Sequence, residues 1–156
     1  MARIHVSDEL ELKLSRMYTH TDDICKKAIY EGAKVMADAM KAEIDALPVD
    51  DSKHEWDKMR SGIRTIQKIG LQKSFGVAPF RESNGVWDTH LGFEGYNEMV
   101  SNYYTGQANS MIARSVNAGT SFLRANPFID RTSRNFGMKA RERMEEVIKE
   151  ELAKET

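Results

Sequence analysis

The chain has 156 residues, which is enough for one domain with a hydrophobic core. Hydrophobic residues make up 40% and charged residues 30%, so neither a disordered chain nor a membrane protein is expected. The 23 basic and 24 acidic residues leave a net charge of -1, which excludes a global field that would attract nucleic acid or acidic lipid.

We expect a single domain over residues 1–156, beginning with an arm over residues 1–20. This arm combines a short extended start, residues 3–6, with a short helix that Ser7 caps and that ends near Tyr18. The sequence contains neither an apolar run of signal-peptide length nor one of about 18 residues that would span a membrane. We therefore expect synthesis in the cytoplasm.

The clearest predicted helix follows, capped by Thr21 and stopped by Pro48. Its apolar residues recur at steps of three and four, and at about 25 residues it is expected to be the spine of the domain. Gly32 costs up to about 1 kcal/mol relative to alanine in a helix interior. Another backbone is therefore expected to approach closely there.

Residues 48–62 are polar and rich in turn residues, which predicts a surface loop. A short helix is expected over residues 63–71, with Gly70 ending it early.

After residue 74 the spacing of apolar residues changes from that of a helix to that of the strands of a β-hairpin. Residues 75–80 and 86–93 are predicted strands around an Asn84-Gly85 turn, because Asn-Gly favours the positive φ angles of a tight hairpin. Pro79 cannot donate to a strand ladder, so the first strand lies at an edge or bulges there. One strand face is expected to be buried and the other exposed.

Residues 94–108 show no clear period and are predicted to be mostly loop. A helix is expected from Asn109, as its cap, to Ala118, with Gly119 ending it in the left-handed conformation. The last helix is predicted to start near Thr132, and residues 150–156 to fray or to pack on a neighbour. Together these elements indicate an α+β fold, in which a small antiparallel sheet with a hairpin packs against the two long helices.

Common catalytic motifs are absent: the sequence contains no glycine-rich phosphate loop, no H-E-x-x-H and no G-x-S-x-G. No catalytic residue, cofactor or metal is expected. Two groups of acidic residues and histidine have the composition of a metal site, but a solvated loop explains the first and helix capping the second. The first group is Asp50, Asp51, His54 and Glu55, and the second is His20, Asp22 and Asp23. A hydrolase with an unrecognised site around His54 or His90 is the remotest alternative.

A basic stretch lies between Asn109 and Arg143, opposed only by Asp130 and Glu142. Arginine binds phosphates as well as carboxylates, so this surface fits either DNA or an acidic face of a neighbouring subunit. Subunit pairing is the preferred interpretation, because no base-stacking aromatic residues are interleaved with the arginines. A small DNA-binding accessory protein using the arginines of residues 114–143 is the alternative function.

Several segments, in their order along the chain, resemble the tail-component (tail-completion or head-tail joining) family of long-tailed bacteriophages. They are A-I-Y-E-G-A-K-V-M-A-D-A-M at residues 28–40, L-G-F-E-G-Y-N at 91–97, T-G-Q-A-N-S-M-I-A-R-S-V-N-A-G-T-S-F at 105–122, and N-P-F at 126–128. Asn117 and Ala118 depart from the family pattern, and so does the lack of a second proline at residues 129–132.

The resemblance implies a noncatalytic structural virion protein of the neck or tail, assembled in the bacterial host cytoplasm. It implies a homo-oligomeric ring, expected to be a hexamer, that links the tail tube to the head connector, with DNA passing through its lumen. The implied partners are further copies, the tail terminator, tail-tube and head-connector proteins, and no membrane. Tail completion, tail termination and head closure remain alternatives.

A closed ring requires two different complementary faces on each subunit. The loops at residues 81–85, 97–108 and 119–128 are the candidates for one face and the basic start of the last helix for the other. The interface candidates are Arg114, Gly119, Thr120, Ser121, Arg124, Pro127, Phe128, Arg131, Arg134 and Arg141.

Overall fold

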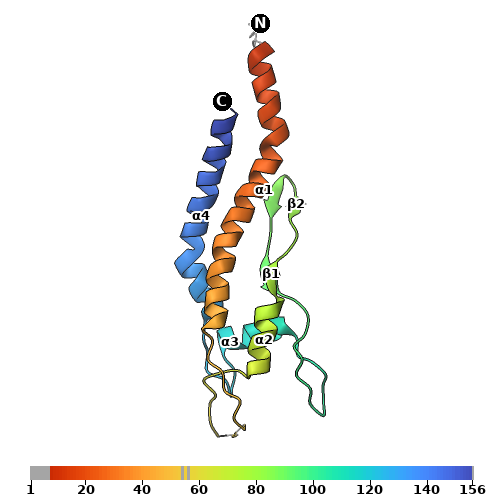
Figure 1. The fold of residues 1–156 in the computed structure, drawn as a ribbon, viewed down its shortest axis with the longest axis vertical. Helices are drawn as coiled ribbons and strands as arrows, with labels where there is room; N and C mark the ends of the chain where they lie inside the picture. Colours follow the sequence, from red (N-terminus) through yellow and green to blue (C-terminus); the bar gives the residue numbers. More distant parts are fainter. Residues whose placement is uncertain (1–7, 54, 56, 156) are drawn as a thin grey trace.

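A computed structural model describes the backbone of residues 8–53, 55 and 57–155, and side chains from residue 20 onward. This part of the chain has the predicted α+β fold, with long helices and short antiparallel strands (Figure 1). Its elements are α1 (Asp8–Asp45), α2 (Thr65–Ser74), β1 (Phe75–Val77), β2 (Arg81–Ser83), β3 (Val86–Asp88), β4 (Leu91–Phe93), α3 (Asn109–Ala118) and α4 (Phe128–Lys154).

Helices α1 and α4 lie side by side and antiparallel, and we call this pair the rod (Figure 1). The 38 residues of α1 make it about 57 Å long at 1.5 Å per residue. Gly32 lies at the contact: a Cβ there would be 2.5 Å from Met144 Cγ and 3.2 Å from the Ala140 carbonyl oxygen. The predicted close approach at Gly32 is therefore confirmed.

The predicted break between an N-terminal arm and the spine helix is wrong, because α1 continues from Asp8 to Asp45. Residues 18–23 contain neither glycine nor proline, and threonine and histidine cost only tenths of a kcal/mol in a helix, so nothing there stops it. Asp22 and Asp23 accordingly lie inside a helix and not at its first turn. The predicted extended start, residues 3–6, lies outside the described residues.

The predicted hairpin is present as two paired segments. β1 pairs with β4 and β2 with β3, both antiparallel, around Asn84 and Gly85 with φ angles of 52° and 78°. Between the segments, residues 78–80 oppose only residues 89 and 90, so the first strand carries one extra residue. This bulge contains Pro79, as the missing donor predicts.

One face of the second hairpin strand packs on the helices, as predicted. Trp87 Nε1 donates a hydrogen bond to Asp22 Oδ1 at 3.0 Å, and Lys26 Nζ lies 4.3 Å from the centroid of the indole. Leu91 and Phe93 continue this face and pack against the core. The hairpin is thus held along the side of α1 (Figure 1).

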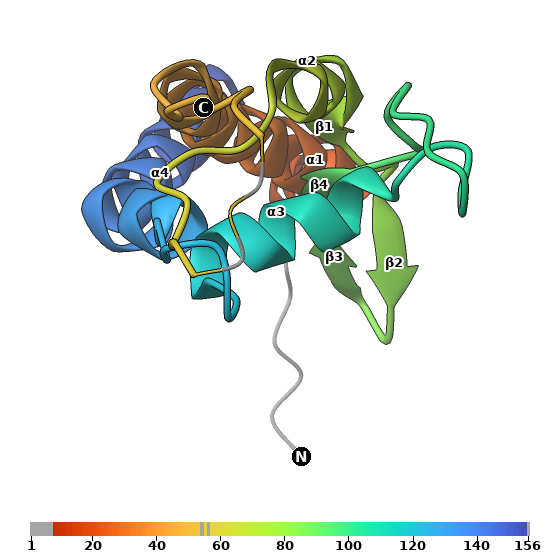
Figure 2. The same ribbon diagram turned by 90° about the horizontal axis from the view of Figure 1, so that it is seen from below.

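One end of the molecule is broader than the rod, and we call it the foot. It contains α2, α3 and the loops at residues 46–64, 94–108 and 119–127 (Figures 1 and 2). The core lies where the foot meets the rod. Its most deeply buried residues there are Ile44, Leu47, Leu71, Ala113 and Phe128.

Gly70 does not end a helix, since α2 continues through it to Ser74. A Cβ at Gly70 would be 2.5 Å from Asn109 Oδ1 and 2.8 Å from Asn97 Cβ. Glycine is therefore present because two side chains of the foot pack against the helix, which a local sequence pattern cannot reveal.

The ends of α3 differ in part from the prediction. Asn109 is the first helical residue and makes no capping bond; its buried side-chain amide donates to the Glu94 carbonyl oxygen at 2.9 Å. Gly119 ends the helix with the expected positive φ, 78°, but its ψ of 166° is extended and not left-handed helical. A Cβ at Gly119 would be 2.9 Å from the backbone nitrogen of Ala125, so the loop also requires glycine for space.

Helix α4 begins at Phe128, four residues before the predicted start at Thr132. Asn117 Oδ1, at the end of α3, accepts hydrogen bonds from the backbone N–H groups of Ile129 at 3.0 Å and Asp130 at 3.3 Å. The cap of α4 therefore comes from the preceding helix and satisfies N–H groups that have no partner within α4. At its other end α4 is helical to Lys154.

Candidate protein-binding groove

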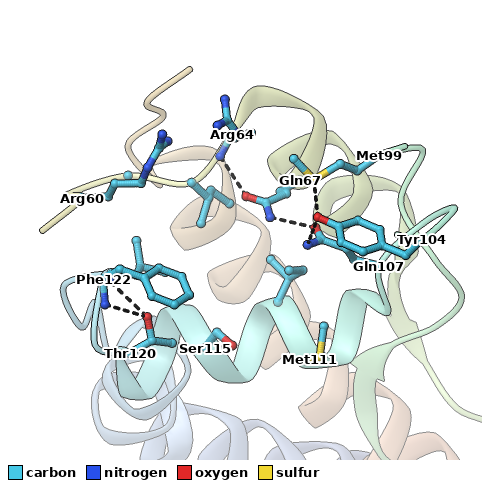
Figure 3. Close-up of a pocket in the computed structure, with 14 residues that line it drawn as sticks. Arg60, Arg64, Gln67, Met99, Tyr104, Gln107, Met111, Ser115, Thr120 and Phe122 are labelled. Carbon is cyan, nitrogen blue, oxygen red and sulfur yellow. Dashed lines mark hydrogen bonds between the residues drawn. The ribbon is translucent and has the colours of Figure 1, made fainter. Parts of the chain in front are cut away.

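A groove of about 510 Å³ lies in the foot, between α2 and α3 (Figure 3). Loops close its two ends: Tyr104 lies at one end and Phe122 at the other. Its apolar lining residues are Ile63, Met99, Tyr104, Met111, Ile112, Phe122 and Leu123. A surface hollow with this lining is suited to an apolar partner segment.

A short arm, residues 98–106, projects from the foot beside the groove (Figure 2). Its two sides are bridged between Val100 and Thr105, and the Ser101 N–H donates to the Tyr104 carbonyl oxygen at 2.9 Å across the tip. Gly106 closes the base with a φ of 79°. Tyr103 at the tip is 94% exposed.

Amide side chains fix the base of the arm to the groove. The buried Asn97 accepts backbone N–H bonds from Met99 at 3.1 Å and Gln107 at 2.9 Å through its Oδ1. The Gln107 side chain accepts a hydrogen bond through its Oε1 from Gln67 Nε2 of α2, at 2.8 Å. Its Nε2 donates a hydrogen bond to the Tyr104 hydroxyl, at 3.2 Å (Figure 3). These hydrogen bonds fix the base of the arm to α2, and order that exists before a partner binds lowers the entropy lost on binding.

The opposite end of the groove is also ordered. Thr120 Oγ1 accepts backbone N–H bonds from Phe122 at 3.3 Å and Leu123 at 3.0 Å (Figure 3). The Arg60 N–H donates to the Phe122 carbonyl oxygen at 2.8 Å, and the Arg124 N–H to the Arg60 carbonyl oxygen at 2.8 Å. These bonds hold the loop after α3 against the segment that precedes α2.

The groove carries little charge. Arg60 and Arg64 lie at its rim, and their guanidinium groups point away from it and donate to backbone carbonyl oxygens of the 50–52 turn (Figure 3). Although 30% of the chain is charged, residues 99–113 contain no charged side chain, and Arg114 is the only charged residue from 99 to 123. Depletion of charge together with tyrosine and methionine is typical of protein interfaces.

Some of the predicted interface residues lie in the loop beside the groove, and others do not. Thr120 lines the groove, and Gly119, Ser121, Arg124 and Pro127 belong to the same loop. Phe128 does not belong to an interface, because its side chain is fully buried at 0% exposure. It contacts Phe93 with ring centroids 6.4 Å apart, and so anchors α4 in the core.

Arg131 forms an ion pair within the molecule, and its side chain is 38% exposed. Its Nη2 lies 2.6 Å from Glu43 Oε2 and 2.9 Å from Asn126 Oδ1, so it joins α4 to α1. The hydrogen bond from Arg131 lowers the pKa of Glu43, and the bond to Glu43 raises the pKa of Arg131.

The rest of the basic stretch is not a uniform positive surface. Arg143 lies within 3.6 Å of carboxylate oxygens of Glu31, Glu146 and Glu150. Arg114, on α3, and Arg134 and Arg141, on α4, are exposed, and Arg141 forms a 3.5 Å pair with Glu145. Three exposed arginines on two helices therefore remain as interface candidates.

The acidic group at residues 50–55 stabilises a turn and a helix start. Asp51 accepts from the Thr65 N–H at 2.9 Å and the Thr65 hydroxyl at 2.6 Å, and Asp50 accepts from the Ser52 N–H at 3.0 Å. These hydrogen bonds lower the pKa of both carboxyls. His54 lies outside the described residues, and the described side chains include no metal-binding cluster of three or more His, Cys, Asp or Glu residues.

The two histidines whose side chains the structure describes, His20 and His90, are on the surface. His20 is exposed on α1, and neighbouring Asp22 binds Trp87. His90 lies on the exposed face of the hairpin, where its Nε2 is 2.6 Å from Arg81 Nη2 and 3.9 Å from Asp88 Oδ1. The salt bridge from Arg81 lowers the pKa of Asp88. Arg81 and Asp88 form a cross-strand ion pair at the end of β2 and β3 that lies away from the turn.

Sequence reasoning missed the groove, because its walls come from segments up to about 60 residues apart. The charge-free run of residues 99–113 is the signal that could have located it.

No protein-family model, no curated protein and no solved structure matches this chain. No helix in the part that the structure describes is both long and apolar enough to cross a membrane.

Proposed function

We propose that the protein is a structural component of a bacteriophage neck or tail, a ring-forming tail-completion or head-tail joining protein that links the tail tube to the head connector. The class of protein comes from the order of the resembling segments. The observation that carries the proposal is the apolar groove, charged only at its rim, with the hydrogen-bonded arm beside it, because these features suit a protein that works through contacts with other proteins.

A ring of identical subunits needs two unlike faces on each copy that fit one another. The foot supplies a hollow face, the groove, and a projecting one, the arm. The rod supplies further surface for proteins above or below the ring, here proposed to be tail-terminator, tail-tube and head-connector proteins. A sixfold ring would leave a lumen for DNA.

The direct test is removal of the gene from the phage or prophage that encodes it, followed by electron microscopy of the lysate. We expect filled heads and separate tails, with joined particles restored when the protein is supplied from a plasmid. Joined, infectious particles in the absence of the protein would contradict the proposal.

The DNA-binding alternative receives less support from the site. Arg131 and Arg143 are both paired with glutamates, which removes them from the set that would contact phosphates. If the protein nevertheless binds duplex DNA through phosphates, the affinity measured by fluorescence anisotropy will fall steeply between about 50 and 200 mM salt. We expect no such salt-sensitive binding by the isolated protein.

A further inference from the structure

Two consecutive tyrosines of the arm have different environments. Tyr104 turns inward, lines the groove of its own subunit and is hydrogen-bonded to Gln107. Tyr103, the next residue, is 94% exposed, and Val100 on the same arm is 71% exposed. The arm therefore carries two exposed side chains with apolar surface, Val100 and Tyr103, and Tyr103 does not line the groove of its own subunit.

The groove has the complementary chemistry. Met111 is 51% exposed on the first turn of α3, and Ile63, Ile112 and Leu123 continue the apolar floor beneath it. A volume of about 510 Å³ is ample for one tyrosine side chain with its neighbours. Both the arm between residues 99 and 106 and the groove interior lack charged groups, so bringing them together desolvates no ion.

We propose that the arm of one copy of this chain inserts Tyr103 into the groove of a neighbouring copy, beside Met111. The two surfaces differ, so each copy still offers one arm and one groove after the contact forms. Such a heterologous contact repeats from subunit to subunit and closes into a ring if the rotation allows. The inference deepens the proposed function, since it names the contact that would build the ring.

Two single substitutions test the arm and the groove independently. Tyr103→Asp places a charge on the arm tip, where the side chain is almost fully exposed and the fold should tolerate it. Met111→Asp places a charge in the groove at the third residue of α3, where an acidic side chain favours the helix dipole. Tyr30→Asp is the matched control, because Tyr30 is 54% exposed on the rod, away from both surfaces.

The readout is the mass of the full chain in sedimentation and light scattering over a concentration series up to about 1 mM, the weak end of specific association. We expect the unmodified protein and Tyr30→Asp to associate with rising concentration. Tyr103→Asp and Met111→Asp should each weaken association about thirtyfold or more. Mixed together, they should form a complex of two chains and no larger species, because only one intact arm and one intact groove remain.

Far-UV circular dichroism first establishes that each variant is folded. If Tyr103→Asp is not folded, Tyr103→Ser replaces it, and if Met111→Asp is not folded, Met111→Gln replaces it. The proposal is overturned if the unmodified protein stays monomeric throughout, if a folded arm or groove variant associates normally, or if the mixture yields no two-chain complex. None of these results depends on the particle phenotype of the gene deletion, so failure of this contact and failure of the proposed function are distinguishable.

Discussion

At the scale of single residues, two helical glycines have opposite environments. A Cβ at Gly70 would be 2.5 Å from Asn109 Oδ1, whereas nothing lies within 4 Å of a Cβ at Gly137. We predict that Gly70→Ala destabilises the protein by about 1–3 kcal/mol, because the clash outweighs the gain in helix propensity.

Gly137→Ala is the control and should stabilise the protein by about 0.5–1 kcal/mol. Urea unfolding followed by circular dichroism measures both free energies of unfolding. Equal effects of the two substitutions would show that Asn97 and Asn109 do not pack against α2 as described.

The Glu43–Arg131 ion pair makes a prediction about pH. The pKa of Glu43 is lowered from 4.5 by the hydrogen bond from Arg131, so in acid the unfolded chain binds a proton more readily than the folded one. Stability from this pair is therefore full above pH 4.5 and is lost as pH falls through the lowered pKa.

We predict that Glu43→Gln costs up to about 1 kcal/mol at neutral pH, the upper end for a partly exposed pair, and that this difference disappears in acid. The measurement is the free energy of unfolding of both proteins as a function of pH. Glu142→Gln, at an exposed position of α4, should show no such convergence. A Glu43→Gln cost that is the same at all pH values would contradict the ion-pair explanation.

At the scale of elements, the start of α4 depends on one side chain of α3. Asn117 Oδ1 accepts two backbone N–H groups of the first turn of α4, so Asn117→Ala leaves them without a protein partner. We predict a loss of about 1 kcal/mol in the free energy of unfolding. The comparison is Asn135→Ala, at an exposed position inside α4, where alanine should be neutral or slightly stabilising.

Elements with local causes could be predicted from the sequence. The Asn84-Gly85 turn, the bulge at Pro79 and the end of α3 at Gly119 each follow from a residue that restricts its own backbone. The α+β class and the two long helices follow from periodicity in the same way.

Elements whose bounds depend on residues far away in the sequence could not be predicted from it. The continuation of α2 through Gly70 depends on Asn97 and Asn109, and the early start of α4 depends on Asn117. The candidate site can be predicted only in part: the loop containing Thr120 borders the groove, but Phe128 is buried in the core and Arg131 pairs with Glu43 within the molecule. Burial and ion pairing depend on the three-dimensional partner, which no short-range pattern specifies.

At the scale of the whole molecule, the exposed arginines of α4 remain a candidate second contact surface. We predict that Arg134→Glu with Arg141→Glu lowers the yield of infectious particles about tenfold or more when the variant complements the gene deletion, because like charges across an interface are costly. Lys34→Glu with Lys41→Glu makes the same charge change at the same spacing on α1, the other helix of the rod, so a larger loss from the arginine variant assigns the effect to α4. Normal titres from the arginine variant would remove α4 from the interface.

The antiparallel rod has a practical consequence. The beginning of α1 and the end of α4 both lie at the far end of the rod from the foot (Figure 1). A fluorescent protein or affinity tag fused at either end would thus sit away from the groove and the arm. In electron micrographs of assembled particles, such a fusion would mark which way each subunit points along the tail axis.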